Sequence, residues 1–318
     1  MTDIFAVLRE RALERMASAP DEDFLVRGIW KVELAFKPNP AERTFQYTFW
    51  IAMTKGQGCC YCTGDDPRGR ELVGSDAREL AKEKTCISIA TLDSLYASLP
   101  RQPVAVHQLQ GNSIEKTKAR TAIILAEAER LLAGVSGRCG RVVNVGVVGN
   151  VLRDLRLKGY DVCASDLERG IIGSTVHGVE IQDGTKTFDL IGQSDLAIVT
   201  GMTIATDSLE LIVEEARKAG TKLLIFAETG ANFGEEYCRT IGIDTVVSEP
   251  FPFYVFQGTS TIEVFRRGQV VSDKDKGQSK ERKGKRETGR KGSSDGVQVR
   301  RRKPEVKTAK DAKSAKKD

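Results

Sequence analysis

The sequence predicts an α/β protein in which a Rossmann-like, doubly wound parallel sheet follows a smaller α+β domain and precedes a disordered basic tail. Three observations predict this order. Before residue 134, two strand-like runs meet at a short turn, as in an antiparallel hairpin. After residue 140, apolar runs alternate with amphipathic segments, which is typical of parallel strands joined by crossover helices. After residue 267 the sequence has no aromatic residue and few apolar ones.

The first predicted domain, of the α+β class, covers residues 1–134. Thr2 or Asp3 can cap an opening helix, since both side chains accept hydrogen bonds from backbone N–H groups. The two strand-like runs follow, and the second leads into a loop rich in glycine and cysteine. Strands are expected at 25–36 and 43–54, the loop at 55–67, and helices at 76–84, 91–99 and 114–133, the last capped by Ser113.

The second predicted domain, Rossmann-like, covers residues 141–267, after a glycine-rich linker at 134–141. Its clearest helix starts at 208, because Asp207 and Glu210 have capping-box spacing, and it ends at Gly220. Each strand-like run before a helix predicts one parallel strand. Strands are expected at 142–148, 161–165, 196–200, 222–227, 245–247 and 260–265, and helices at 151–158, 208–219 and 232–241.

The predicted tail, residues 268–318, carries the basic charge of the chain. It holds 18 Lys and Arg residues against 8 Asp and Glu, so the remainder is mildly acidic although the whole chain has a net charge of +5. So few apolar residues cannot offset the entropy lost on ordering. The tail can bind nucleic acid by releasing counterions, but without aromatic residues for base stacking a solubilising extension is favoured.

The chain is expected to be cytoplasmic. Its seven cysteines are odd in number and unevenly spaced, which does not fit a secreted disulfide framework, and no segment has the length of a membrane span. The sequence also lacks a G-x-S-x-G elbow and a P-loop, and it has two histidines, which disfavours triad hydrolases and phosphoryl transfer from ATP. A homo-oligomer is compatible with the sequence, which does not fix the oligomeric state.

A glycine turn follows the first strand of the second domain, in VVNVGVVGN. Gly146 and Gly149 let the backbone approach a ligand, and Asn150 lies at the start of the next helix, whose N–H groups are free to donate. Asp166 ends the second strand, where an acid can accept hydrogen bonds from a ribose. The spacing departs from G-x-G-x-x-G, so it suits S-adenosylmethionine better than a dinucleotide. The alternative is a tight turn that binds nothing.

Three more loops follow strands of the same predicted sheet: TGMTIATDS, ETGANF and SEPFPF. The carboxyl ends of parallel strands share one edge, so hydroxyl, carboxylate and aromatic side chains are expected to converge there on a small ligand. The residues expected to bind it are Gly146, Gly149, Asn150, Asp166, Thr200, Gly201, Thr203, Thr206, Glu228 and Thr229.

The segment DLAIVTGMTIATDSLELIVEEARKAGTKLLIFAETGANF resembles the heavy-metal-chelation domain family, whose function is unknown. In that family an enolase-N-terminal-like domain precedes a Rossmann-like domain, with the presumed site between them. The resemblance implies a protein that binds a small molecule or a metal chelate in an interdomain cleft. Thr206 stands where the family has asparagine, and Glu228 where it has glycine.

A second candidate site is the cysteine loop, in which Cys59, Cys60 and Cys62 offer soft ligands for zinc, copper(I) or an iron–sulfur cluster. No second C-x-x-C completes a set of four, so a reactive or transiently metal-binding thiol is favoured over structural zinc, and buried, inert cysteines are the alternative. Three functions therefore stay open: binding of a metal or metal chelate, S-adenosylmethionine-dependent transfer, and association with nucleic acid through the tail. The sequence does not settle whether the protein is an enzyme.

Overall fold

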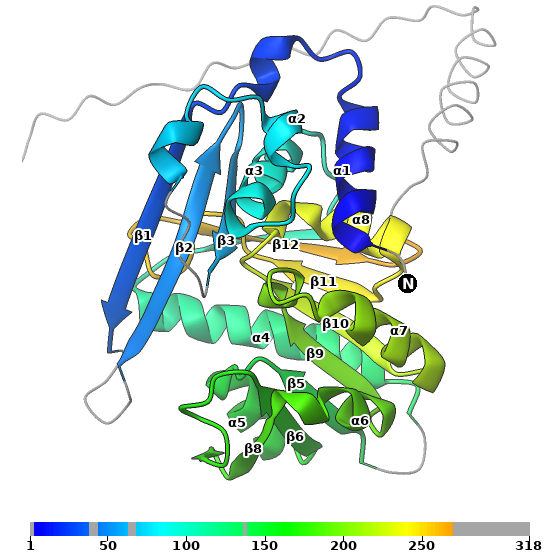
Figure 1. Cartoon of the computed structure of the whole chain (residues 1–318). Coiled ribbons are helices and arrows are strands. Elements are labelled where there is room, and N and C mark those ends of the chain that lie inside the picture. Colours follow the sequence, from blue (N-terminus) through cyan, green and yellow to red (C-terminus); the bar gives the residue numbers. More distant parts are fainter. Residues whose placement is uncertain (1–2, 38–43, 63–67, 136–138, 270–318) are drawn as a thin grey trace, which may run out of the picture. The chain divides into compact units, whose positions relative to one another are not determined.

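The computed structural model describes residues 3–37, 44–62, 68–135 and 139–269 (Figure 1). Nearly all of the predicted tail lies outside these residues. The chain order of the elements confirms the predicted α/β class: a small antiparallel sheet comes first, and a large, mostly parallel sheet follows. No helix among the described residues is long and apolar enough to cross a membrane.

The small sheet contains β1 (Gly28–Phe36), β2 (Phe45–Met53) and β3 (Gln57–Tyr61), all antiparallel and in that order. The predicted hairpin is β1–β2, but the prediction of a loop at the cysteines is wrong, because Gln57–Tyr61 pairs with Phe49–Met53. Helix α3 (Cys86–Ala97) packs on one face of this sheet, with α1 (Ile4–Arg15) beside it. Shorter helical segments here are Asp21–Phe24, Gly69–Leu72 and α2 (Ala77–Leu80).

The large sheet has nine strands, and its six central strands are parallel. Along the chain, the strands are added first to one side of β5 and then to the other, so the topological switch point lies between β5 and β9. In sheet order the strands are β4 (Ala105–Leu109), β12 (Ser260–Arg266), β11 (Thr245–Ser248), β10 (Lys222–Ala227), β9 (Leu196–Thr200), β5 (Arg141–Val145), β6 (Asp161–Asp166), β8 (Val179–Asp183) and β7 (Thr175–Val176).

Helices cover both faces of the large sheet. The long α4 (Ser113–Leu132) and α5 (Gly149–Leu157) share one apolar cluster with the sheet, while α6 (Thr187–Gly192) and α7 (Leu209–Ala219) pack on the other face. The remaining short segments are Gly184–Lys186, Gly201–Ile204, Ala231–Phe233, α8 (Gly234–Glu236) and a π turn at Tyr237–Ile241.

Of the two residues predicted as possible caps of the first helix, Asp3 is the cap. The predicted caps of α4 and α7, Ser113 and Asp207, are wrong. Helix α4 is capped by Asn112, which forms a capping box with Glu115, because an amide oxygen at this position reaches two N–H groups at once. Asp207 does not cap α7 either. Its carboxylate instead forms an ion pair with Lys84 at 2.8 Å, which links α7 to the segment before α3.

The large sheet includes elements from before the predicted linker. Strand β4 pairs with β12, and helix α4 packs on β9, β10 and β11, although both precede residue 134. The predicted boundaries between 1–134 and 141–267 stay a prediction. Physically, α4 completes the apolar face of the sheet, so residues on both sides of the linker share one core.

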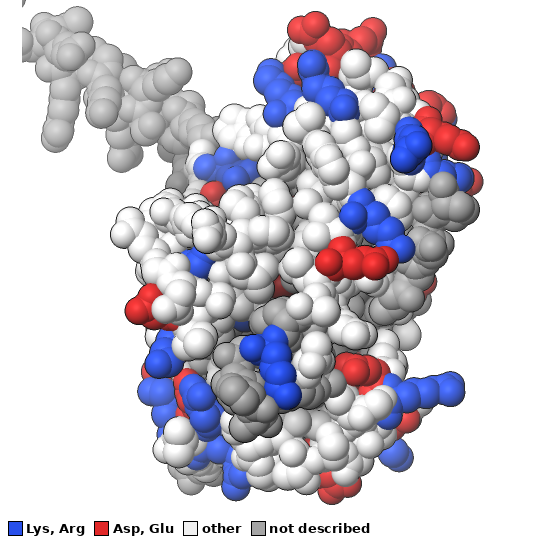
Figure 2. All heavy atoms as spheres, turned by 90° about the vertical axis from the view of Figure 1, so that its left-hand side faces the viewer, with Lys and Arg blue, Asp and Glu red and all other residues white. Residues whose placement is uncertain are grey.

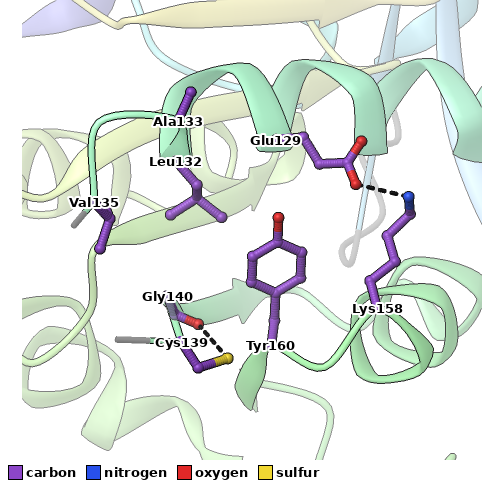
Figure 3. A pocket seen from close by; sticks show the side chains of 8 residues that line it. All are labelled: Glu129, Leu132, Ala133, Val135, Cys139, Gly140, Lys158 and Tyr160. Atoms are coloured by element: carbon purple, nitrogen blue, oxygen red, sulfur yellow. Dashed lines mark hydrogen bonds and ion pairs between the residues drawn. The ribbon is translucent and has the colours of Figure 1, made fainter. Parts of the chain in front are cut away.

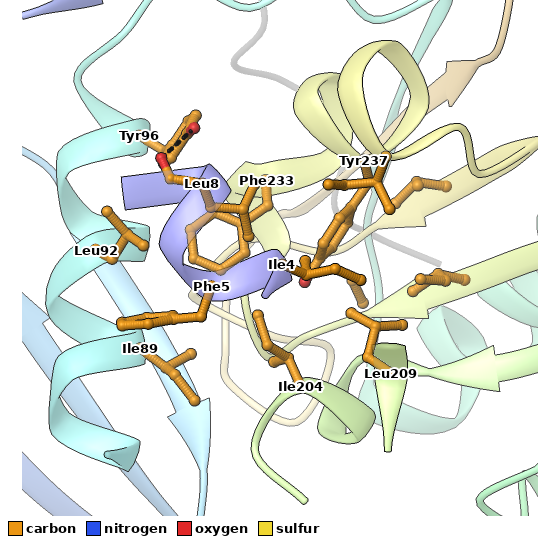
Figure 4. Packing of buried hydrophobic residues seen from close by; sticks show 14 of the residues in the cluster. Ile4, Phe5, Leu8, Ile89, Leu92, Tyr96, Ile204, Leu209, Phe233 and Tyr237 are labelled. Carbon is orange, nitrogen blue, oxygen red and sulfur yellow. Dashed lines mark hydrogen bonds between the residues drawn. The ribbon is translucent and has the colours of Figure 1, made fainter. Parts of the chain in front are cut away.

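The two sheets also share a core, which Figure 4 shows around α1. Phe233, from the loop after β10, lies against Tyr96 of α3 and Tyr237, with ring centroids 5.2 Å and 5.8 Å away. The Tyr96 hydroxyl donates a hydrogen bond to the carbonyl of Leu8, 2.8 Å away. Because these residues come from three segments far apart in sequence, the two sheets are joined by buried apolar packing.

Candidate functional site

The glycine turn after β5 lies beside the loop after β9, at the switch point of the large sheet. Gly146 has a φ of +77°, and a Cβ at this position would overlap Oγ1 of Thr200. One strand further, a Cβ on Gly201 would lie 2.6 Å from the carbonyl oxygen of Thr229. The loops after β5, β9 and β10 are therefore neighbours at one edge, as the sequence predicts for parallel strands.

Asp166 joins the same edge, but its carboxylate shapes the turn. Oδ2 accepts a hydrogen bond from the N–H of Val147 at 2.8 Å, and Oδ1 accepts one from Glu168 at 2.9 Å. Asn144 accepts from the N–H of Val148 in the same turn. Gly149 and Asn150 follow as the first residues of α5. The expected bond from Asp166 to a ribose stays a prediction, and it would have to compete with these backbone donors.

The predicted threonines mostly serve the local backbone. Thr203 Oγ1 donates to the carbonyl of Thr200 at 3.0 Å, and the Thr206 hydroxyl lies 3.0 Å from that of Ser208. Thr229 Oγ1 accepts from the N–H of Tyr61 at 2.9 Å. This last bond ties β3 of the small sheet to the carboxyl edge of the large one.

A buried charged cluster lies where β10 and β11 end, and we call its members Arg120, Glu228, Glu249, Tyr61 and Tyr254 the Arg120 centre. Arg120 of α4 places Nη1 2.7 Å from Oε1 of Glu228 and 3.1 Å from Oε2 of Glu249. The side chains of Arg120, Glu228 and Glu249 are 8%, 13% and 0% exposed. Oε1 of Glu249 and Nε of Arg120 are both buried and have no hydrogen-bond partner among the described residues.

Aromatic rings enclose this charge. The Arg120 guanidinium lies over the ring of Tyr254, 3.9 Å from its centroid, and 4.9 Å from that of Phe226. The Tyr61 side chain lies close to that of Glu228, and burial raises the pKa of both Tyr61 and Tyr254, so both phenols stay neutral. Lys116, one helical turn before Arg120, donates to the carbonyl of Phe256 at 2.6 Å and so fixes the loop after β11.

Burial raises the pKa of Glu228 to about 7, and the nearby Glu249 raises it too, while Arg120 opposes both effects. A carboxyl group with such a pKa can gain or lose a proton near neutrality. The sequence singled out Glu228 and the carboxylate of SEPFPF but missed Arg120 and Tyr61. The available signal was Lys116 and Arg120, two cations on the face of α4 that also carries the buried Ile124 and Ala128.

A pH-dependent stability follows from the raised pKa of Glu228. A glutamate in the unfolded chain has a pKa of about 4.3, so Glu228 binds its proton more tightly in the folded state. This contribution is fully present below about pH 4 and is lost as the pH rises towards 7. Glu228→Gln is expected to remove it, so that the variant gains stability relative to the wild type over this range. Urea unfolding across this pH range measures the difference, with Glu129→Gln as a control that keeps the wild-type slope.

Gly146→Ala is expected to destabilise the protein by about 1–3 kcal/mol, because the new Cβ adds backbone strain and overlaps Thr200. Gly159 separates the two causes: its φ is +87°, but a Cβ there meets nothing within 4 Å. Gly159→Ala should therefore cost only the strain, about 1–2 kcal/mol. Equal losses in urea unfolding would mean that the approach to Thr200 is not tight.

The three cysteines of the second candidate site do not share one environment, because Cys60 and Cys62 pack at the core under α3 and Cys59 does not. Cys59 belongs to the aromatic cluster around Phe49 and Phe253, whereas Cys60 belongs to the core under α3, because successive side chains of a strand point to opposite faces. Burial raises the pKa of both thiols, which disfavours the thiolate that binds metals. Within the described part of the chain, no group of three or more His, Cys, Asp or Glu residues is placed to hold a metal ion. Metal binding at Cys59, Cys60 and Cys62 thus gains no support.

A cavity of about 320 Å³ lies elsewhere, near the start of β5 (Figure 3). It is at the amino end of this parallel strand, opposite the edge that carries Gly146 and Glu228. An ion pair of 2.6 Å between Lys158 and Glu129 borders it. The residues that line it are Glu129, Leu132, Ala133, Val135, Cys139, Gly140, Lys158 and Tyr160.

The surface charge of the described body is mixed. Figure 2 shows one side of the molecule, where basic and acidic side chains alternate around a wide uncharged area. Nucleic-acid binding through the tail concerns residues outside the described ranges and stays a prediction.

No family model and no curated protein matches this chain. Its fold is similar to two solved structures of DUF364-family proteins of unknown function. The protein from Pyrococcus horikoshii is 11% identical, with 82% of this chain and 99% of that chain covered and a TM-score of 0.46. The one from Desulfitobacterium hafniense is 14% identical, with 80% and 98% covered and the same TM-score of 0.46.

A partial similarity extends to an NADPH-dependent glyoxylate/hydroxypyruvate reductase from Sinorhizobium meliloti, 13% identical, with 43% of this chain and 64% of that chain covered and a TM-score of 0.30. These similarities concern the fold, and heavy-metal chelation stays a prediction. The strand order gives the chain an α/β fold with a Rossmann-like large sheet. In fold the chain is similar to DUF364 proteins of unknown function.

Proposed function

We propose that the protein binds a small organic molecule at the carboxyl edge of the large sheet, with the Arg120 centre as its recognition group. The observation that carries this proposal is the unpaired Oε1 of the fully buried Glu249. A purely structural ion pair is expected to satisfy all its buried polar atoms, because each unsatisfied one costs about 1–3 kcal/mol. A ligand that donates a hydrogen bond there would offset this cost.

The position of the centre supports the proposal. Strand β10 is the neighbour of β9, which borders the switch point, and Glu228 is the first residue after β10. In open α/β sheets, ligands bind beyond the carboxyl ends of strands at such a point. The glycine turn and the first residues of α5 lie at the same edge. Side chains of different chemistry thus gather where this class of fold binds ligands.

A bare metal ion fits this set poorly. Calcium takes six to eight oxygen ligands and magnesium six, whereas the centre offers two carboxylates that already share the guanidinium of Arg120. S-adenosylmethionine is a better candidate, because its sulfonium and ammonium groups are cationic and the glycine turn lies at the same edge of the sheet. Transfer chemistry is not implied by binding alone.

Native mass spectrometry tests the proposal. Protein is incubated with a small-molecule metabolite extract, with S-adenosylmethionine in a separate sample, and is desalted before measurement. We expect a bound species below about 1 kDa on the wild type and on Glu129→Gln, a substitution in the exposed ion pair with Lys158. The species should be lost or reduced in Glu249→Gln and Tyr61→Phe. Absence of any bound species on the wild type, or equal binding by all four proteins, would refute the proposed site.

A further inference from the structure

The proposed function leaves the class of ligand open, and the inference drawn here rests on that function. We propose that the Arg120 centre binds an organic cation, an ammonium or amidinium group held by Glu228 and Glu249. The reason is that one buried carboxylate oxygen of the centre lacks a donor. Nη1 of Arg120 alone serves both carboxylates, at 2.7 Å and 3.1 Å. Oε1 of Glu249 accepts no hydrogen bond.

The charges that face Glu228 do not cancel when it is ionised. Among the described residues, Arg120 from α4 is the cation that faces it, and Glu249 after β11 faces it with a second carboxylate. Tyr61 and Cys59 of β3, like Tyr254, stay protonated because burial raises their pKa. The centre then holds two negative charges against one positive charge. Lys116 does not restore the balance at this point, because its ammonium donates to the carbonyls of Phe256 and Gly258. A cationic ligand would restore the balance of charge.

The surroundings fit a cation that is organic. Tyr254 already presents its ring face to the Arg120 guanidinium at 3.9 Å, and Tyr61 lies stacked on Phe253 with centroids 5.9 Å apart. Aromatic faces attract ammonium and guanidinium groups and tolerate their apolar stems. Glu228 gives access, since its side chain is 13% exposed while that of Glu249 is fully buried. The cation is thus expected to meet Glu228 first and Glu249 behind it.

Protons compete with such a ligand. Glu228 attracts a cation only when it is ionised, and burial raises the pKa of this group to about 7. The ionised fraction therefore rises from about one tenth at pH 6 to about nine tenths at pH 8. Cation affinity should increase by roughly tenfold over this interval in the wild type. It should become nearly independent of pH in Glu228→Gln, in which no carboxyl titrates at this position.

The test uses two matched probe series on the full-length protein: benzamidine, benzamide and benzoate, and butylamine, butanol and butyrate. Titration calorimetry at pH 8 measures binding, and thermal denaturation monitors folding. We expect the cationic member of at least one series to bind ten times more tightly than its neutral and anionic analogues. Glu228→Gln and Glu249→Gln should each weaken it about tenfold, while Glu129→Gln should match the wild type.

Two results would overturn the inference: neutral or anionic members that bind as tightly as the cation, or no binding of either cation up to about 10 mM. Neither result alone refutes the proposed function. If the bound species from the metabolite extract depends on Glu249 and Tyr61 but is neutral or anionic, the site stands and the cation preference is wrong. If no species binds and no probe binds, both proposals fall together.

Discussion

Arg120→Leu is expected to lower the free energy of unfolding by about 3–5 kcal/mol at pH 7, because it leaves buried carboxylates without their cation. Glu249 has a fully buried side chain, and its Oε2 has Arg120 as its ion-pair partner. Burial also raises the pKa of Glu228, which shows how poorly its site solvates charge. Urea unfolding followed by circular dichroism measures the loss.

Arg130 provides a matched control on the same helix. It also pairs with a glutamate, Glu127, but its side chain is 39% exposed, so Arg130→Leu should cost less than about 1 kcal/mol. Adding Glu228→Gln and Glu249→Gln to Arg120→Leu should recover a large part of the loss, since amides are cheaper to bury than carboxylates. Similar losses for Arg120→Leu and Arg130→Leu would mean that water reaches the Arg120 centre freely.

The pH dependence of the stability loss is an independent test of the charges in the Arg120 centre. Lowering the pH protonates Glu228, whose pKa burial raises to about 7, and so removes part of the negative charge that Arg120 neutralises. The gap between the wild type and Arg120→Leu should therefore narrow as the pH falls from 7 towards 5. A gap that stays constant would assign the loss to packing of the Arg120 stem against Phe226 and Tyr254 instead of to charge.

The elements predicted correctly from the sequence are those that a local pattern of apolar residues or turn residues marks. Strand β9 and helix α7 follow from apolar periodicity, and the order of β5, β9 and β10 follows from crossover connections, so the shared edge of Gly146, Thr200 and Glu228 could be predicted. Strand β3 could not be predicted, because its glycine and two cysteines resemble a loop. The structure explains the glycine: a Cβ on Gly58 would collide with the backbone of α3.

Long-range contacts account for what the sequence did not reveal at the site. Arg120 and Glu249 are 129 positions apart in the sequence. Tyr61 lies close to Glu228 because the end of β3 contacts the loop after β10. Strand β4 likewise joins the large sheet through a partner, β12, at the far end of the described chain. No local pattern encodes such pairs. In contrast, the two cations on the buried face of α4 are visible in the sequence once its apolar stripe is drawn.

The shared core of the two sheets leads to the second large effect. Phe233→Ala is expected to lower the free energy of unfolding by about 3–5 kcal/mol, because the fully buried ring packs edge-on against Tyr96 and Tyr237 (Figure 4). Leu157→Ala is the control, since Leu157 is 79% exposed on α5 and should change stability by less than about 0.5 kcal/mol.

The number of urea-unfolding transitions in Phe233→Ala tests whether the two sheets unfold together. If Phe233 joins the two sheets in one cooperative unit, tryptophan fluorescence and far-ultraviolet circular dichroism should report the same shifted urea transition in Phe233→Ala. Trp30 and Trp50 both lie in the small sheet, so fluorescence reports on that sheet, whereas circular dichroism is dominated by the helices of the large one. Two separate transitions, with only one of them moved, would show that the sheets unfold independently. In that case the contacts of Tyr61 with Thr229 and Glu228 would break whenever the small sheet unfolds. Ligand binding would then depend on the stability of the small sheet.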